Sequence, residues 1–202
     1  MRLGGFTPFT LTDFPGEIAA ICFTQGCNFS CPFCHNKLLI PACPGDNNLP
    51  NQKEAQKVID FLALRKGRLH GLVVSGGEPT LQEDLTEFLS EVRALGYKIK
   101  LDTNGSRPQV LELLLQKGLL DMVAMDIKAP WDKYALLAGK RLDTDKLKSS
   151  LRLILESKVD HIFRTTFVPH LLTKEDIEAI RQSLPPDVKY VVQPYVEQGL
   201  AA

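Results

Sequence analysis

The stretch IAAICFTQGCNFSCPFCHN, residues 18–36, joins an apolar run typical of a buried β-strand to three closely spaced cysteines. Cys27, Cys31 and Cys34 have the spacing C-x3-C-x2-C. Three thiolates can hold three irons of a 4Fe-4S cluster, whereas an electron carrier with such a cluster uses four cysteines. The fourth iron is then open to a substrate unless a distant residue binds it.

Zinc is the alternative metal for the same cysteines. A structural zinc site takes four protein ligands, and His35 would complete a Cys3His set. Cys34 and His35 are adjacent in the chain, however, and adjacent residues make poor joint ligands of a tetrahedral ion. We therefore favour an iron–sulfur cluster over zinc, and both over a cysteine cluster with a purely structural role.

The other two cysteines have different predicted roles. Cys22 lies within the apolar run and is predicted to be a small buried core residue. Cys43 lies in an irregular segment, residues 35–50, and is either a free thiol or a fourth ligand. A segment of this length is either functional or surface decoration. The clustering of three cysteines does not resemble a disulfide framework and indicates a reducing compartment.

Length and charge indicate an ordinary globular protein. The 202 residues suffice for one domain with a hydrophobic core, so we expect a single domain over residues 1–202. The 24 lysines and arginines balance the 24 aspartates and glutamates, which gives no support to nucleic-acid or membrane-surface binding. No apolar run approaches the roughly 20 residues of a membrane span, and the N-terminus is too polar for a signal peptide. We expect a cytoplasmic protein.

Short runs rich in β-branched residues alternate with helical patterns along the chain. Strands are predicted over residues 18–24, 71–75, 98–102, 121–127, 161–167 and 189–193. Helices are predicted over residues 52–65, 80–96, 108–118, 145–157 and 173–183. Repeated strand–helix units imply parallel strands with right-handed crossovers, and six units are too few for a closed eight-stranded barrel. We therefore expect an α/β fold, a partial (β/α)6 barrel related to the TIM barrel.

Two of the predicted helices carry capping signals at their start. Thr80 with Glu83 is predicted to form a capping box at the second helix, and Thr173 with Asp176 is predicted to cap the fifth.

Polar motifs lie at or just beyond the carboxyl end of every predicted strand. In chain order they are the cysteine run, GGEP, DTNG, DIK, RTT and QPY. Ligands of parallel α/β folds bind at the carboxyl ends of the strands. The sequence therefore predicts one site that gathers all six motifs.

The run CNFSCPFCHN, followed in order by SGGEP, LDTNG and MDIK, resembles the radical S-adenosylmethionine (SAM) superfamily. The opening FTLTDFPGEIAAICFTQGCN and the CHN after the third cysteine resemble the glycyl-radical-enzyme activating proteins, most closely those of anaerobic ribonucleoside-triphosphate reductase. The resemblance covers nearly the whole chain. Its cysteine motif in this setting is specific, whereas GGEP or DTNG alone would be weak signals.

The resemblance implies that Cys27, Cys31 and Cys34 bind a 4Fe-4S cluster whose open iron chelates SAM through its amino and carboxylate groups. The reduced cluster would cleave the sulfonium C–S bond and release a 5′-deoxyadenosyl radical. The cluster and SAM carry this chemistry, while the protein orients them and excludes competing hydrogen donors.

The resemblance also implies contacts with SAM. Phe33 would lie against the adenine, Gly76, Gly77 and Glu78 would meet the amino group, and Arg164 would help to orient the molecule. The residues by themselves leave alternatives open: core packing for Phe33, a plain strand-to-helix turn for the glycine segment, and a solvated strand end for Arg164.

The remaining residues implied by the resemblance follow the third and fourth predicted strands: Asp102, Thr103, Asn104, Asp126 and Lys128. In related activases, such residues bind a monovalent cation beside the SAM carboxylate, here through Asp102, Thr103, Asp126 and the backbone of Ala124. Alternatively, Asp102 and Thr103 cap a turn, and Asp126 pairs with Lys128 as exposed charge.

One position departs from the resemblance. Related formate-lyase activases carry PYH near their end, with the histidine beside SAM, and this chain has Pro194, Tyr195 and Val196. Valine cannot make the histidine's polar contact. The site is therefore expected to close differently, or to hold SAM with fewer polar groups.

The implied function is activation of a glycyl-radical enzyme by abstraction of a backbone glycine hydrogen. The implied partners are an anaerobic ribonucleotide reductase as protein substrate and a flavodoxin or ferredoxin as electron donor. One alternative is a radical SAM oxidoreductase that acts on a small molecule, as 7-carboxy-7-deazaguanine synthase does. Another is a non-catalytic iron–sulfur or zinc protein, although the count of three cysteines disfavours an electron carrier.

Overall fold

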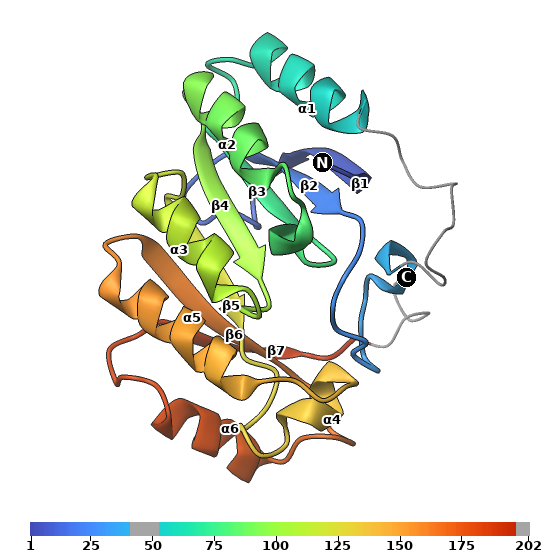
Figure 1. Cartoon of the computed structure of the whole chain (residues 1–202), viewed down its shortest axis with the longest axis vertical. Helices are drawn as coiled ribbons and strands as arrows, with labels where there is room; N and C mark the ends of the chain where they lie inside the picture. The colour runs from blue at the N-terminus through green and yellow to red at the C-terminus, as the bar shows by residue number, and fades with distance from the viewer. Residues whose placement is uncertain (41–52, 197–202) are drawn as a thin grey trace.

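The computed structural model describes residues 1–40 and 53–196, and within them a single seven-stranded sheet organises the fold. The strands follow one another across the sheet in chain order (Figure 1): β1 (Leu3–Thr10), β2 (Ala19–Thr24), β3 (Gly71–Gly76), β4 (Lys98–Thr103), β5 (Met122–Asp126), β6 (Asp160–Phe167) and β7 (Tyr190–Pro194). The pairs from β2 to β7 are parallel. The six predicted strands are therefore confirmed, with ends that differ from the predicted bounds by no more than one residue.

The sheet is open, with β1 at one edge and β7 at the other, as expected for a partial barrel. Strand β1 was not predicted from the sequence. It pairs with β2 in the antiparallel direction, with two register irregularities. Its apolar pattern is interrupted by Gly4, Gly5 and Pro8, residues that are uncommon within strands. No helix follows it either, so the strand–helix alternation that identified the other strands is absent here.

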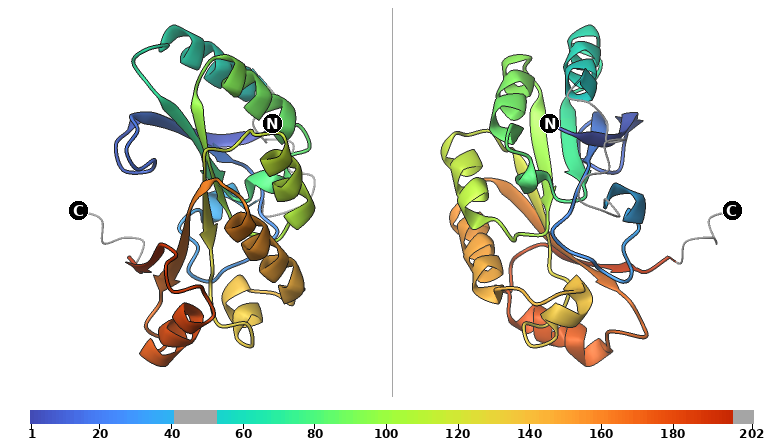
Figure 2. Two further views of the ribbon diagram at one scale, coloured as in Figure 1. Left: turned by 90° about the vertical axis from the view of Figure 1, so that its left-hand side faces the viewer. Right: turned by 45° about the vertical axis from the view of Figure 1, so that its right-hand side comes forward.

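Helices connect the parallel strands: α1 (Lys53–Leu64), α2 (Leu85–Ala94), α3 (Pro108–Gln116), α4 (Tyr134–Ala138), α5 (Thr144–Glu156) and α6 (Lys174–Gln182). Figure 2 shows α1, α2, α3 and α5 together on one side of the sheet, and the loop between β1 and β2 on the other side. No helix in the described part of the chain is both long enough and apolar enough to cross a membrane.

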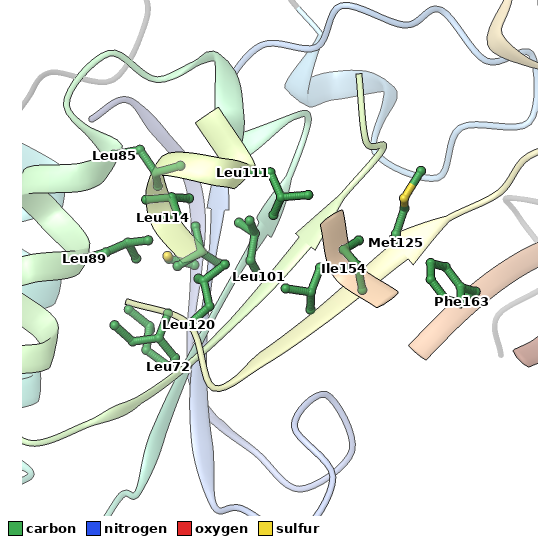
Figure 3. Packing of buried hydrophobic residues seen from close by; sticks show 14 of the residues in the cluster. Leu72, Leu85, Leu89, Leu101, Leu111, Leu114, Leu120, Met125, Ile154 and Phe163 are labelled. Atoms are coloured by element: carbon green, nitrogen blue, oxygen red, sulfur yellow. The ribbon is translucent and has the colours of Figure 1, made fainter. Parts of the chain in front are cut away.

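The main core fills the space between the sheet and these helices. Leu72 and Leu101 of the sheet lie among leucines of α2 and α3, as Figure 3 shows. Cys22 is fully buried in this core, which confirms its predicted role. The opposite face of the sheet carries a smaller cluster in which Phe14, from the β1–β2 loop, packs with Ile21, Val73 and Met122.

Two local predictions differ from the structure. The capping box of Thr80 with Glu83 is wrong, because Thr80 lies in a 3-10 turn, η2 (Pro79–Leu81), and α2 begins after Asp84. The short helix α4 was not predicted at all. Its five residues carry no periodic signal, and it is held by tertiary contacts: the Tyr134 hydroxyl donates to the Asp126 carbonyl at 3.2 Å.

The predicted cap of α6 is confirmed, and it is a full capping box of Thr173 and Asp176.

The contacts of Asp176 make the stability of the fold depend on pH. The Asp176 carboxylate accepts from the Thr173 N–H at 2.9 Å and pairs with Lys133 at 2.7 Å. Lys133 and then Thr173 lower the pKa of Asp176. A depressed carboxyl pKa stabilises the fold above the unfolded value, about 3.9, and this contribution is lost as pH falls through the folded value. Urea unfolding should show Asp176→Asn less stable than wild type at pH 7, with the difference shrinking toward pH 3. A pH-independent difference would contradict the assignment.

Candidate active site

The carboxyl ends of all six parallel strands border one cavity of about 380 Å³. Every residue predicted for the site lines this cavity except Ala124, which lies within β5 and pairs with Asp102 in the sheet. The cavity volume falls in the usual range for small-molecule sites. Residues from distant parts of the sequence therefore meet as the polar motifs predicted.

The segment with the three cysteines leaves β2 and is tied to its neighbours by backbone hydrogen bonds. Gly26 N–H donates to the Leu39 carbonyl at 2.7 Å, and Ser30 N–H donates to the Ala138 carbonyl at 2.9 Å, beside α4 (Figure 1). Glu78 N–H, after β3, donates to the Gly26 carbonyl at 2.8 Å. The loop is thus held at both ends, and α4 supports its middle.

The three thiols face the same cavity. No group of three or more His, Cys, Asp or Glu side chains within residues 1–40 and 53–196 has a metal-binding arrangement. Burial raises the pKa of Cys27 to about 11 and also raises that of Cys31, an effect that nearby Lys128 partly offsets. Metal binding must therefore displace thiol protons, which couples it to pH.

Gly76 and Gly77 allow β3 to approach the end of β2 closely. A Cβ atom on Gly76, which has φ +117°, would lie 2.2 Å from the Thr24 nitrogen, and one on Gly77 would lie 2.0 Å from the Gly26 oxygen. Both contacts are with backbone that cannot move aside cheaply. The glycine pair is thus required by the packing of the two strand ends, whatever ligand the cavity takes.

Glu78 is fully buried, and its carboxylate is engaged by protein donors. Oε1 accepts from the Thr80 N–H at 3.2 Å and the Thr103 hydroxyl at 2.7 Å, and Oε2 accepts from the Asn104 N–H at 2.7 Å. Burial raises the pKa of Glu78, while these hydrogen bonds act in the opposite direction. The side chain joins the ends of β3 and β4.

Replacing Glu78 by glutamine should destabilise the fold by about 2 kcal/mol. The amide NH2 of glutamine would face either the Asn104 N–H or the donors at Oε1, so a donor meets a donor in either orientation. Urea unfolding measures the loss. The exposed Glu156→Gln is the matched control and should stay within about 0.5 kcal/mol of wild type. Equal stability of both variants would show that the buried hydrogen bonds contribute nothing.

Charged side chains of alternating sign cross β4, β5 and β6 beneath the cavity. Arg164 Nε donates to Asp126 Oδ1 at 2.9 Å, and its Nη1 donates to Asp102 Oδ2 at 3.3 Å. Lys100 pairs with Asp102, and Lys128 pairs with Asp126 at 3.4 Å. Burial acts to raise the pKa of Asp126, but Arg164 and Lys128 outweigh it and hold that pKa below its usual value.

This network bears on the alternatives that the sequence left open. Arg164 is not a solvated strand end, since it bridges two carboxylates and its side chain is only 19% exposed. Thr103 does support a turn, because its oxygen accepts from the Gly105 N–H at 3.1 Å, but its hydroxyl also donates to Glu78. Asp126 does pair with Lys128, at the cavity rather than on an open surface.

Core packing, one of the two roles considered for Phe33, is observed. Phe33 belongs to the main core and also lines the cavity, with Lys128 Nζ 6.0 Å from the ring centroid. At the far side of the opening, the ring of Tyr195 stacks on His35 with centroids 5.6 Å apart. Val196 is exposed and does not line the cavity, so Tyr195 is the residue of this segment that meets the cysteine loop.

Several residues that line the cavity were not singled out from the sequence. Ser75, Thr166 and Gln193 belong to the motifs SGGEP, RTT and QPY, which the sequence analysis placed at strand ends, although no role was assigned to these three residues. Asp13 could not be found from a strand-end motif. It reaches the cavity from the β1–β2 loop, whose position depends on the unpredicted strand β1.

The chain belongs to the radical SAM superfamily, whose family model matches residues 21–184. The family implies a 4Fe-4S cluster and SAM, so the protein is a radical SAM enzyme. A Methanocaldococcus jannaschii protein named "Putative glycyl-radical enzyme activating enzyme MJ1227" is 35% identical over 199 residues, which cover 96% of this chain and 79% of that protein. A second protein of that organism, with the same name but MJ1632, is 27% identical over 86% of this chain and 66% of its own length.

Solved structures share the fold at low sequence identity. Streptococcus suis SuiB bound to precursor peptide SuiA has a TM-score of 0.67 at 19% identity, over 88% of this chain and 39% of that chain. Native anSMEcpe with bound AdoMet has a TM-score of 0.64 at 16% identity, over 86% of this chain and 50% of that chain. The protein thus corresponds to half or less of these larger chains.

Proposed function

We propose that this radical SAM enzyme activates a glycyl-radical enzyme by removing a hydrogen atom from a backbone glycine. The observation that carries the proposal is the 35% identity over almost the whole chain with a relative named as a glycyl-radical enzyme activating enzyme. The cavity is compatible with it, because the sheet is open between β1 and β7 and a polypeptide segment needs such access.

Cys27, Cys31 and Cys34 are the residues proposed to hold the cluster. Their side chains line one cavity, and Cys22, the other described cysteine, is fully buried in the core, so it cannot serve as a fourth ligand. When bound and reduced, the cluster with SAM supplies a 5′-deoxyadenosyl radical, which takes the glycine hydrogen to give 5′-deoxyadenosine. Three protein ligands suit this chemistry, since one iron stays available to SAM.

The protein's own contribution is to position SAM and exclude water. Phe33 offers an aromatic face, the Lys128 ammonium and the Arg164 guanidinium offer positive charge for a carboxylate, and the backbone at Gly76 and Gly77 can approach a ligand closely. We do not extend the proposal to a monovalent cation. The Thr103 hydroxyl donates to Glu78, and the carboxylates of Asp102 and Asp126 already face three cationic side chains.

We further propose anaerobic ribonucleotide reductase as the protein substrate and a flavodoxin or ferredoxin as the electron donor. The support is the resemblance of residues 9–28 and of the CHN at Cys34, His35 and Asn36 to the activating proteins of that reductase. A small-molecule substrate is the second candidate. A Saccharolobus solfataricus protein named "Probable GTP 3′,8-cyclase" is 33% identical but matches only 57% of this chain. The match to the protein named as an activating enzyme covers 96% of this chain and therefore favours the activase.

The test combines SAM cleavage with detection of a protein radical. After anaerobic reconstitution and reduction, we expect 5′-deoxyadenosine to form, and we expect a glycyl-radical electron paramagnetic resonance signal when the partner reductase is added. SAM cleavage without a radical on any glycyl-radical partner would contradict the activase proposal. Dependence of SAM cleavage on a small molecule would support the small-molecule alternative. An intact cluster whose spectrum does not change with SAM, and that does not cleave SAM, would indicate an electron carrier.

A further inference from the structure

A ring of hydrogen bonds connects the cysteine loop to the end of β4. Asn28, the residue after Cys27, donates from Nδ2 to the hydroxyl oxygen of Ser106 at 2.7 Å. Ser106 N–H donates to Asn104 Oδ1 at 2.9 Å, and Asn104 Nδ2 donates back to Asn28 Oδ1 at 2.9 Å. The side-chain amide of Asn28 therefore donates and accepts a hydrogen bond within the ring, although Asn28 does not line the cavity.

The β4 side of this ring is firmly held. Asn104 is buried, and its N–H donates to the carboxylate of fully buried Glu78. The next carbonyl, that of Gly105, accepts from the buried Ser150 hydroxyl of α5 at 2.7 Å. The ring thus ties the cysteine loop to a point fixed by both β3 and α5.

The loop side of the ring carries a hydrogen bond to a thiol sulfur. The N–H of Phe29, the residue after Asn28, donates to Cys27 Sγ at 3.4 Å. This N–H belongs to the peptide group that joins Asn28 to Phe29, so the orientation of the Asn28 backbone determines where it points. Hydrogen bonds to cluster sulfurs are one of the means by which proteins set the potential of an iron–sulfur cluster.

We propose that Asn28 is a positioning residue: through Asn104 and Ser106 it fixes the Phe29 N–H on Cys27 Sγ and so sets the reduction potential of the cluster. The inference rests on the proposed function, in which Cys27 binds the cluster. An N–H that points at the sulfur stabilises the reduced, more negative cluster. Loss of the ring should therefore make the one-electron reduction harder.

The test measures the reduction potential of the reconstituted cluster in Asn28→Ala, Ser106→Ala and the double variant. We expect a more negative potential in each, with the double variant no further shifted than Asn28→Ala, because both changes break the same ring. We also expect loss of iron to a chelator about 10-fold faster in Asn28→Ala. Ser149→Ala is the matched control, since Ser149 is exposed and its hydroxyl donates to the Asp145 carbonyl of the same helix, and it should leave both quantities unchanged.

The outcomes separate this inference from the proposed function. A wild-type potential in Asn28→Ala, or additive shifts in the double variant, would overturn the inference while leaving SAM cleavage by the wild type intact. If the wild-type protein holds no cluster on its three cysteines, the proposed function fails first. Urea unfolding of the metal-free variants checks folding, and Ser106→Ala, which removes a single acceptor, keeps the test valid if Asn28→Ala unfolds.

Discussion

Replacing Cys31 by alanine is expected to remove both the iron–sulfur absorbance and the formation of 5′-deoxyadenosine, down to background. The physical reason is that the site offers three thiols, and the two thiolates that remain are too few to hold a 4Fe-4S cluster. Cys22 cannot replace the missing ligand, because it is fully buried within β2 and burial raises its pKa to about 12. Iron and sulfide analysis after anaerobic reconstitution, together with chromatography of the SAM products, checks the prediction.

Matched controls come from the cysteines outside the motif. Cys22→Ala should keep the cluster, at the cost of some stability from the small cavity left in the core. Cys43 lies outside the described residues, so its alternative roles as free thiol or fourth ligand remain predictions. Cys43→Ala with normal SAM cleavage would identify a free thiol, whereas loss of the cluster would identify a ligand. Full cluster content in Cys31→Ala would contradict the proposed ligation.

Replacing Arg164 by leucine is expected to lower the free energy of unfolding by about 3 kcal/mol. The change leaves the carboxylates of Asp102 and Asp126 without the guanidinium that bridges them. The loss lies at the low end for a broken buried pair, because Lys100 and Lys128 still face the two carboxylates. Urea denaturation of the metal-free protein measures this loss apart from any effect on SAM.

Two further variants distinguish this structural role from a role in SAM binding alone. Arg141→Leu removes an exposed arginine and should change stability by no more than about 0.5 kcal/mol. Arg164→Lys keeps the charge but offers one nitrogen in place of the two that bond Asp126 and Asp102, so it should recover only part of the loss. An Arg164→Leu protein of wild-type stability that has lost SAM affinity would show that the arginine serves the ligand and not the sheet.

The strand–helix alternation, the open barrel and the positions of the site motifs could be predicted from the sequence. Buried parallel strands such as β2 and β3 appear in the sequence as short continuous apolar runs. In the helices between them the apolar residues recur every three to four positions, so local patterns identify both kinds of element. Because parallel strands bring their carboxyl ends to one edge, knowledge of the strands also placed Cys27, Asp102 and Arg164 around one cavity.

What the sequence could not supply were the elements and contacts that depend on partners far along the chain. Strand β1 is stable only because β2 pairs with it, and α4 has five residues, too few for a helix without tertiary support. The capping prediction at Thr80 failed for a related reason, since its N–H and hydroxyl turn to the buried Glu78 instead.

The sequence by itself thus determined the class of fold and which residues gather at the site, because these follow from local periodicity and from the geometry of parallel strands. Only the tertiary structure decided what each polar group at the site contacts. Glu78 joins two strand ends, Arg164 bridges two carboxylates, and Asn28 connects the cysteine loop to β4. Hydrogen bonds and ion pairs act over a few ångströms, so their partners are set by folding and not by proximity in the chain.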